Sequence, residues 1–265
     1  MTTPKKGLLL ILMAPLMATV LLLLPLGMRA QSCGDSCCEG GPECGTRYFC
    51  EDDGVYGCQC EFGSPIIIDT IGEGFHLTSA QDGVVFDIAG TGHPIPIAWT
   101  AKTSRNAFLA LDRNHNGKID SGKELFGNFT RQPKSHDPNG FLALAEFDKP
   151  ENGGNGDGII DKRDAVFAHL LLWVDENHDG ISQPNELHTL PELGVFSLAL
   201  HYRNDRHFFD QYGNWFRYQA AVNPDPRDGE SKDGRWTFDV FLMTEGTDKD
   251  PLPPPVEGIN PFPPQ

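Results

Sequence analysis

Three acidic loops rich in asparagine and glycine constrain this chain more than any other feature of its sequence. They read DRNHNGKIDSGKEL from Asp112, NGDGIIDKRD from Asn155 and DENHDGISQPNEL from Asp175. In each loop, oxygen-bearing side chains fall at alternate positions and are followed by a glycine, an apolar residue and a further acid. This spacing suits a peptide that wraps around Ca²⁺, because the ion takes roughly six to eight oxygen ligands and glycine permits the sharp turn between them. The loops therefore predict metal binding before any catalytic function.

The first and third loops predict two ligand sets in nearly the same register. The set of the third loop is Asp175, Asn177, Asp179, the backbone carbonyl of Ile181 and Glu186. The set of the first loop is Asp112, Asn114, Asn116, the backbone carbonyl of Lys118, Asp120 and Glu124. Glu124 stands one position later than the matching acid of the third loop, so either the first loop holds thirteen residues or Glu124 does not reach the ion.

The second loop has no acid at its first position, where Gly153 stands. We expect Asp148, which lies beyond a KPENGG insertion, to fold back and take that place. The predicted set is Asp148, Asn155, Asp157, the backbone carbonyl of Ile159, Asp161 and Asp164. Asn, Asp and Gly also gather in ordinary turns, but three such clusters, two with the same D-x-N-H-[ND]-G core, favour metal sites. His115 and His178 hold the fourth positions of their loops, and we expect both to face solvent.

Residues 1–30 have the pattern of an export signal. Lys5 and Lys6 precede a long apolar run, and Ala30 offers a small residue at a cleavage point. The run is also long enough to span a bilayer, so an uncleaved anchor is the alternative, and lipidation of Cys33 is a third option. The sequence therefore predicts a secreted, periplasmic or cell-surface protein that contacts the membrane only through an uncleaved anchor or a lipid.

All seven cysteines lie between Cys33 and Cys60. After an export signal such density predicts a small disulfide-rich module over residues 31–62. Its connectivity stays open, as does the role of the seventh cysteine, and zinc ligation is the competing interpretation.

The rest of the chain predicts an α+β domain over residues 63–245, followed by a Pro-rich disordered tail over 246–265. Short helices are expected at 121–126, 140–147, 162–169 and 184–190, where they would flank the loops as helix–loop–helix units. Strands are expected near 63–100, from 195, from 214 and from 235, and Leu170–Val174 is expected in the core. The aromatic stripes of the last two strands are expected to be core rather than a ligand platform.

The net charge of the chain and the motifs that its sequence lacks disfavour several classes of function. The net charge of −16 disfavours nucleic acid and anionic lipid as partners. The sequence has no G-x-S-x-G elbow, H-E-x-x-H helix or phosphate-binding P-loop, so no catalytic residue is assigned. We expect a non-enzymatic protein whose cofactor is Ca²⁺. The alternatives are an exported polysaccharide or peptide hydrolase that uses calcium structurally, and an adhesion module that contacts a cell-envelope protein or a glycan.

The loops resemble the EF-hand calcium site. The run from Gly72 to about Leu200 is similar to a bacterial secreted segment near the C-termini of RTX-type and iron-regulated surface proteins. The pieces that carry the similarity are GVVFDIAGTG, AWTA, LALDRNHNGKIDSGKELFGNFT, GFLALAEFD and GNGDGIIDKRDAVFAHLLLWVDENHDGISQPNELHTLPELGV. The resemblance implies calcium binding outside the cytoplasm and a structural or surface role. Ala89 and Thr91 stand where that family often has acids, so the turn that begins at Asp87 is expected to be a plain β-turn.

Overall fold

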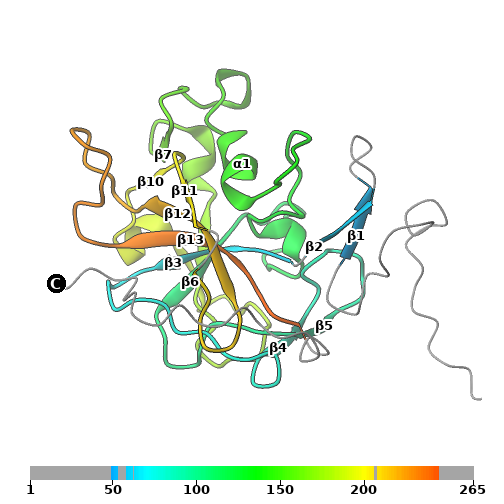
Figure 1. Ribbon diagram of the computed structural model, residues 1–265. Helices are drawn as coiled ribbons and strands as arrows, with labels where there is room; N and C mark the ends of the chain where they lie inside the picture. The colour runs from blue at the N-terminus through cyan, green and yellow to red at the C-terminus, as the bar shows by residue number, and fades with distance from the viewer. Residues whose placement is uncertain (1–48, 53–57, 62, 206–207, 245–265) are drawn as a thin grey trace, which may run out of the picture. The chain divides into compact units, whose positions relative to one another are not determined.

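Antiparallel β-strands dominate the protein (Figure 1). The computed structural model describes residues 49–52, 58–61, 63–205 and 208–244, and it describes side chains in the last two of these ranges. The largest sheet has seven strands in the order β11-β12-β13-β3-β6-β8-β9. Its strands are β3 (Ile66–Asp69), β6 (Asn106–Ala110), β8 (Leu171–Trp173), β9 (Leu187–Thr189), β11 (Arg203–Asn204), β12 (Trp215–Ala221) and β13 (Trp236–Phe241).

Within the described ranges, three two-stranded antiparallel sheets accompany the large one. They are formed by β1 (Phe49–Asp52) with β2 (Cys58–Glu61), β4 (Val84–Phe86) with β5 (Ile95–Ile97), and β7 (Ile159–Asp161) with β10 (Ser197–Ala199). β7 lies within the second acidic loop, so its pairing with β10 connects that loop to the C-terminal half of the domain.

Helix is scarce, and the predicted α+β class with helix–loop–helix units is wrong. The described residues contain one α-helix, α1 (Gly140–Ala145), which Asn139 caps by accepting a hydrogen bond from the amide of Leu142. The expected helices at 121–126 and 162–169 are reduced to the 3-10 turns η1 (Gly122–Glu124) and η3 (Ala165–Ala168). Of two further 3-10 turns, η2 (Pro150–Asn152) lies where no helix was expected, and η4 (Leu190–Leu193) begins only at the last residue of the helix expected at 184–190.

Pairing across the sheet explains the largest error in the helix prediction. Residues 184–190 have an amphipathic pattern and a proline suited to a first turn, yet Leu187–Thr189 form β9 and pair with β8. The strand hydrogen bonds satisfy the backbone there, and Pro191 leaves too short a run for a stable helix. The chain therefore leaves the third loop as a strand.

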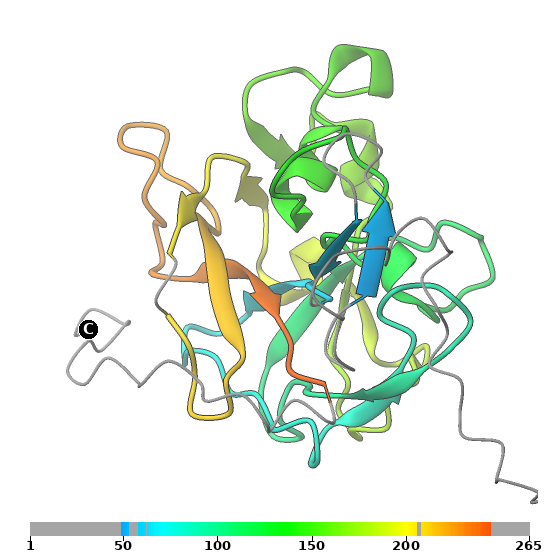
Figure 2. The ribbon, with the colours of Figure 1, turned by 45° about the vertical axis from the view of Figure 1, so that its right-hand side comes forward.

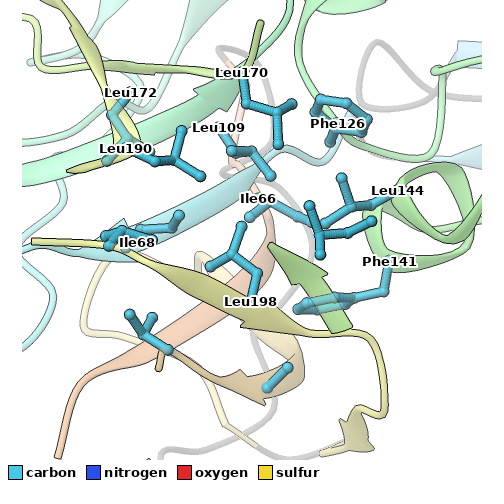
Figure 3. Packing of buried hydrophobic residues seen from close by; sticks show 14 of the residues in the cluster. Ile66, Ile68, Leu109, Phe126, Phe141, Leu144, Leu170, Leu172, Leu190 and Leu198 are labelled. Atoms are coloured by element: carbon cyan, nitrogen blue, oxygen red, sulfur yellow. The ribbon is translucent and has the colours of Figure 1, made fainter. Parts of the chain in front are cut away.

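The central strands are apolar at nearly every position because both faces of the sheet are buried. Ile66 and Ile68 of β3 belong to one core cluster, whereas Ile67, which points to the opposite face, belongs to the other. β6 divides in the same way, with Leu109 on the first side and Phe108 on the second. Figure 3 shows the first cluster, where side chains from β3 and β6 meet side chains from α1.

Different elements cover the two faces. In both ribbon views α1 lies on one side of β3 and β6 and the β4–β5 hairpin lies on the other (Figures 1 and 2). The clusters agree, since Phe141 and Leu144 of α1 belong to the first and Val84 and Phe86 of β4 belong to the second. The second cluster also contains Ile119, so the first acidic loop packs on the same face of the sheet as the β4–β5 hairpin.

Several sequence predictions are confirmed. The run at Leu170–Val174 contains β8 and is buried except for half-buried Leu171. The strands expected from 195, 214 and 235 contain β10, β12 and β13. The C-terminal aromatic stripes are mainly core, since Phe216, Tyr218 and Phe238 are all buried.

Other predictions lie outside the described residues. The expected export signal, the Pro-rich tail and all seven cysteine side chains are among them. The structure thus gives no support to the disulfide-rich module, and the predicted domain boundaries stay predictions. In the described part of the chain, no helix has the length and apolar character needed to span a membrane.

Candidate metal centre

The third loop is held closed from both of its ends by carboxylates. Asp175 Oδ1 accepts hydrogen bonds from the amides of His178 at 2.7 Å and Asp179 at 3.2 Å. Its Oδ2 accepts one from the amide of Gly180 at 2.9 Å, and Gly180 makes the turn with φ 71°. At the other end, Glu186 Oε1 accepts from the amide of Glu176 at 3.1 Å. The acids that were predicted as first and last ligands therefore point back into their own loop.

Two buried tryptophans join this loop to the core. Trp99 Nε1 donates to Asp175 Oδ2 at 2.8 Å, and Trp173 Nε1 donates to Glu186 Oε2 at 3.4 Å. The two indole rings contact each other at a centroid distance of 5.4 Å. Asp175 is 3% exposed and Glu186 is 1% exposed, so each carboxylate lies on the apolar core and is satisfied by donors fixed in position.

The first loop is also closed by hydrogen bonds from its own amides to its first and last acids. Asp112 accepts from the amides of Asn116 at 3.1 Å and Gly117 at 2.8 Å. Glu124 accepts from the amide of Arg113 at 3.1 Å and from that of Asp120 at 3.0 Å. Glu124 thus takes the place that the closing glutamate takes in the third loop, as a thirteen-residue loop requires. Burial raises the pKa of the Glu124 carboxyl, against the backbone hydrogen bonds that lower it.

The second loop reaches the same arrangement through its insertion. Asp148 folds back and accepts from the amides of Gly156 and Gly158, each at 2.9 Å. Asp164 closes the loop by accepting from the amides of Asn155 at 3.1 Å and Asp161 at 2.8 Å. The structure therefore brings Asp148 together with the rest of the predicted set.

The positively charged side chain of Arg163 lies in the second loop, beside two of the predicted ligands. Arg163 forms ion pairs with Asp157 at 2.6 Å and with Asp161 at 2.7 Å. The hydrogen bond from Arg163 lowers the pKa of the Asp161 carboxyl. Two predicted ligands are thus already paired with a guanidinium, which distinguishes this loop from the other two.

The first and third loops pack against each other. The amide of Ile119 donates to Ser182 Oγ at 2.7 Å, and the same hydroxyl donates to the Ile119 carbonyl at 3.2 Å. Both residues are buried. The two loops therefore form one unit whose halves lie 63 positions apart in the chain.

The remaining predicted ligands also lie close to their partners. The side-chain amide of Asn116 donates to Asp120 at 2.8 Å, that of Asn177 to Asp179 at 2.9 Å and that of Asn155 to Asp157 at 3.2 Å. The amides of Lys118, Ile159 and Ile181 each donate to the side-chain oxygen of the residue two positions earlier.

The donor set suits a hard cation. It consists of carboxylate, carboxamide and carbonyl oxygens, the ligands that Ca²⁺ takes. Within the described ranges, no group of three or more His, Cys, Asp or Glu side chains is gathered tightly enough to hold a metal ion. The predicted sets therefore depend on the asparagine and carbonyl oxygens as well as on the acids.

Two further turns are closed in the same way at their start, by an aspartate that accepts hydrogen bonds from amides further along the turn. Asp87 accepts from the amides of Thr91 at 3.0 Å and Gly92 at 2.6 Å, and Asp69 accepts from those of Gly72 and Gly74, each at 2.8 Å. Both turns read D-x-x-G-x-G, a shared signal that the sequence interpretation missed at Asp69. The Asp87 turn is therefore closed by its carboxylate rather than by backbone bonds alone.

One histidine prediction is wrong. His178 was expected to face solvent, but its Nδ1 lies 2.9 Å from the Thr100 carbonyl oxygen and its Nε2 lies 2.8 Å from that of Asp82. The ring thus fastens the third loop to the segments on either side of the β4–β5 hairpin. His115, at the same position of the first loop, is exposed as expected.

Together the fold and the loops define a β-rich domain with carboxylate-closed acidic loops, outside the helix–loop–helix class. A model of the SPM domain family matches residues 66–235, and the chain belongs to that family. It is also similar to the iron-regulated protein FrpA of Neisseria meningitidis serogroup C, with 41% identity over 143 residues. That match covers 53% of this chain but 12% of FrpA, so the chain spans only a small part of its relative.

These findings correct the family that the sequence suggested. The EF-hand-type and RTX-like identification is wrong, because the matching family is the SPM domain and the acidic loops lack paired flanking helices. The ligand-like spacing of the acids prompted the EF-hand identification. In the structure, however, the first loop follows β6 and the third loop lies between β8 and β9, so strands rather than paired helices hold these loops.

Proposed function

We propose that this chain is a non-enzymatic calcium-binding protein of the cell surface or the extracellular space, and that calcium stabilises the folded state of its three acidic loops. The observation that carries the proposal is the repeated closure of the loops. In each loop an acid at the start and an acid at the end accept amide hydrogen bonds from within the loop, with the other oxygen ligands between them.

The physical reason is charge. Asp175, Asp179 and Glu186 lie on one short loop, and the first and last of them are buried. Like charges held close together in a site of low polarity repel one another, and a divalent cation among them removes that cost. Binding to the native state alone adds stability by mass action, about 2.7 kcal/mol for one site at 100 times Kd.

We expect the loops to differ in affinity. The first and third loops share the contact between Ile119 and Ser182, so order in one favours order in the other. The second loop must give up or rearrange the ion pairs of Arg163 before a cation can use Asp157 and Asp161 fully. We therefore assign the tighter sites to the first and third loops.

The location outside the cytoplasm rests on the pattern of residues 1–30. Outside the cytoplasm, calcium is abundant enough to fill weak sites, and extracellular modules bind calcium with a Kd of about 10⁻⁴–10⁻³ M. A cell-envelope protein or a glycan is the partner we propose.

Calorimetric titration of the purified full chain with Ca²⁺, and separately with Mg²⁺, tests the proposal. We expect calcium to bind with a stoichiometry above one and to raise the thermal unfolding midpoint, and Asp175→Ala and Asp112→Ala each to lower the stoichiometry. Asp228→Ala, a change in an exposed loop outside the three sites, is the matched control and should bind as the wild type does. The absence of calcium heat and an unchanged midpoint on chelation would refute the proposal.

A further inference from the structure

A carboxylate far from the acidic loops is buried in the sheet without full compensation. Asp239 of β13 is 0% exposed. Its Oδ2 accepts a hydrogen bond from the amide of Gly140 at 2.8 Å, and the side chain of Ser64 supplies another hydrogen bond. Its Oδ1 has no hydrogen-bond partner among the described residues. Burial raises the pKa of Asp239 to about 7, although those two hydrogen bonds and the charge of Arg217 oppose the rise.

Arg217 is the cation whose charge acts on Asp239, but its guanidinium is paired with another carboxylate. Arg217 lies at the irregularity of β12 between Phe216 and Tyr218, where a bulge can redirect a side chain. Its guanidinium pairs with Asp137 and lies over the ring of Trp215 at 4.7 Å. Its Nε is buried and has no hydrogen-bond partner in the part of the chain that the structure describes. The Arg217 side chain is 14% exposed and that of Asp137 is 45% exposed, so this cation connects a half-exposed carboxylate to the interior.

Each element packed around Asp239 contributes a polar group. β12 contributes Arg217 and Tyr218, and Tyr218 is paired in register with Asp239. The Tyr218 hydroxyl is buried, no described residue forms a hydrogen bond with it, and burial raises its pKa. The remaining groups are Ser64 before β3, the Gly140 amide at the start of α1, Tyr202 beside Tyr218, and Asp137 with His136, which lie 3.7 Å apart.

From this arrangement we propose that Arg217 is a pH-operated latch: it pairs with Asp137 while Asp239 is neutral, and it turns toward Asp239 when that carboxyl ionises. Ionisation places an unpaired charge in the core, and such a charge is costly until a partner neutralises it. The exchange leaves Asp137 unpaired, but that side chain is half exposed and water can solvate it.

The latch would control the segment that leads into α1. Asp137 precedes Asn139, which caps the helix through its side-chain oxygen and whose amide donates to Gln132 Oε1 at 3.0 Å. The side-chain amide of Asn139 also donates to the Asp137 carbonyl at 3.1 Å. Loss of the bond between Arg217 and Asp137 therefore loosens residues 132–139 as pH rises through neutrality.

Hydrogen exchange of the full chain between pH 5.5 and 8.5, expressed as protection factors, tests the proposal. We expect protection of residues 132–139 in the wild type to fall roughly tenfold across this range, which corresponds to about 1.4 kcal/mol. In Asp239→Asn, which keeps the shape of the side chain and cannot ionise, protection should stay high throughout. In Asp137→Asn it should be low throughout.

Asp225→Asn is the matched control, because that carboxyl pairs with Arg227 and has a pKa lowered to about 2 by that hydrogen bond, well below the range. It should behave as the wild type does. A carboxyl ¹³C NMR titration of the wild type follows Asp239 directly and serves even if the Asp239→Asn variant does not fold. Equal pH dependence in Asp239→Asn and the wild type, or an Asp239 resonance that does not titrate between pH 5 and 9, would overturn the latch.

Discussion

The indole nitrogen of Trp99 donates a hydrogen bond to Asp175 Oδ2 at 2.8 Å, across 76 positions of the chain. Trp99 is fully buried and contacts Phe108 at a centroid distance of 4.3 Å and Phe86 at 5.0 Å. One hydrogen bond thus joins an aromatic core to the first acid of an exposed loop. The state of the third loop and the packing of this core are therefore linked.

Trp99→Phe should separate these two roles, because it keeps an aromatic ring and removes the donor. We expect a loss of about 1.5–3 kcal/mol in the free energy of unfolding, the usual contribution of a hydrogen bond to a charged group, together with weaker calcium binding. Chemical denaturation and calorimetric titration measure the two effects. Trp236→Phe, on β13 away from the loops, is the control for ring replacement. Unchanged calcium binding in Trp99→Phe would show that the core does not position Asp175.

The turn glycines of the first and third loops give a matched pair. Gly117 and Gly180 both have positive φ, 78° and 71°, so alanine costs about 1–2 kcal/mol at either place. A Cβ at Gly117 meets nothing within 4 Å, whereas one at Gly180 would lie 2.9 Å from Val84 Cγ2. We expect Gly180→Ala to destabilise the protein by about 1–3 kcal/mol more than Gly117→Ala does. Thermal unfolding of the two variants checks this, and equal losses would mean that the third loop does not pack against β4.

Local sequence spacing was enough to place the loops and their acids. Asp175 and Glu186 stand at the ends of a loop as their spacing indicates, and even the fold-back of Asp148 follows from the missing acid at Gly153. The run around Leu172 was likewise expected in the core, and Leu172 is buried there. These features depend on residues close together in the chain, where spacing determines geometry.

The class of the fold could not be predicted in that way, because it depends on pairing between distant strands. β3 lies between β13 and β6, and Ile67 pairs with Phe238 on one side and Phe108 on the other. No local periodicity reveals such neighbours, and the loop pattern suggested flanking helices that the sheet replaces. The positions of His178 and Asp239 were missed for the same reason, since their partners lie far away in sequence.

Arg163→Ala should improve the second loop as a calcium site. The change frees Asp157 and Asp161 from a guanidinium that pairs with both. Because exposed ion pairs contribute about 0.2–1 kcal/mol each and two are lost, we expect calcium affinity at this loop to rise about two- to thirtyfold. Titration of the variant in an Asp112→Ala, Asp175→Ala background isolates the site. Arg227→Ala, which breaks an ion pair outside the loops, is the control, and weaker binding in Arg163→Ala would mean that Arg163 supports the loop instead of competing for it.

Asp239→Asn should remove a pH-dependent loss of stability. The pKa of Asp239 is about 7 in the folded state and near 3.8 when unfolded, so its contribution is fully present below about pH 4 and is lost as pH rises through about 7. The free energy of unfolding of the wild type should therefore fall relative to Asp239→Asn by up to about 1.4 kcal/mol per pH unit between these values. Urea denaturation of both proteins at intervals from pH 4.5 to 8 gives the difference. Asp225→Asn is the control, because the carboxyl that it replaces has a pKa of about 2 and is ionised throughout the range. Parallel stability curves for the wild type and Asp239→Asn would show that this carboxyl is ionised across the range in the folded protein, as it is in the unfolded chain, and the core would then have to accommodate its charge by another contact.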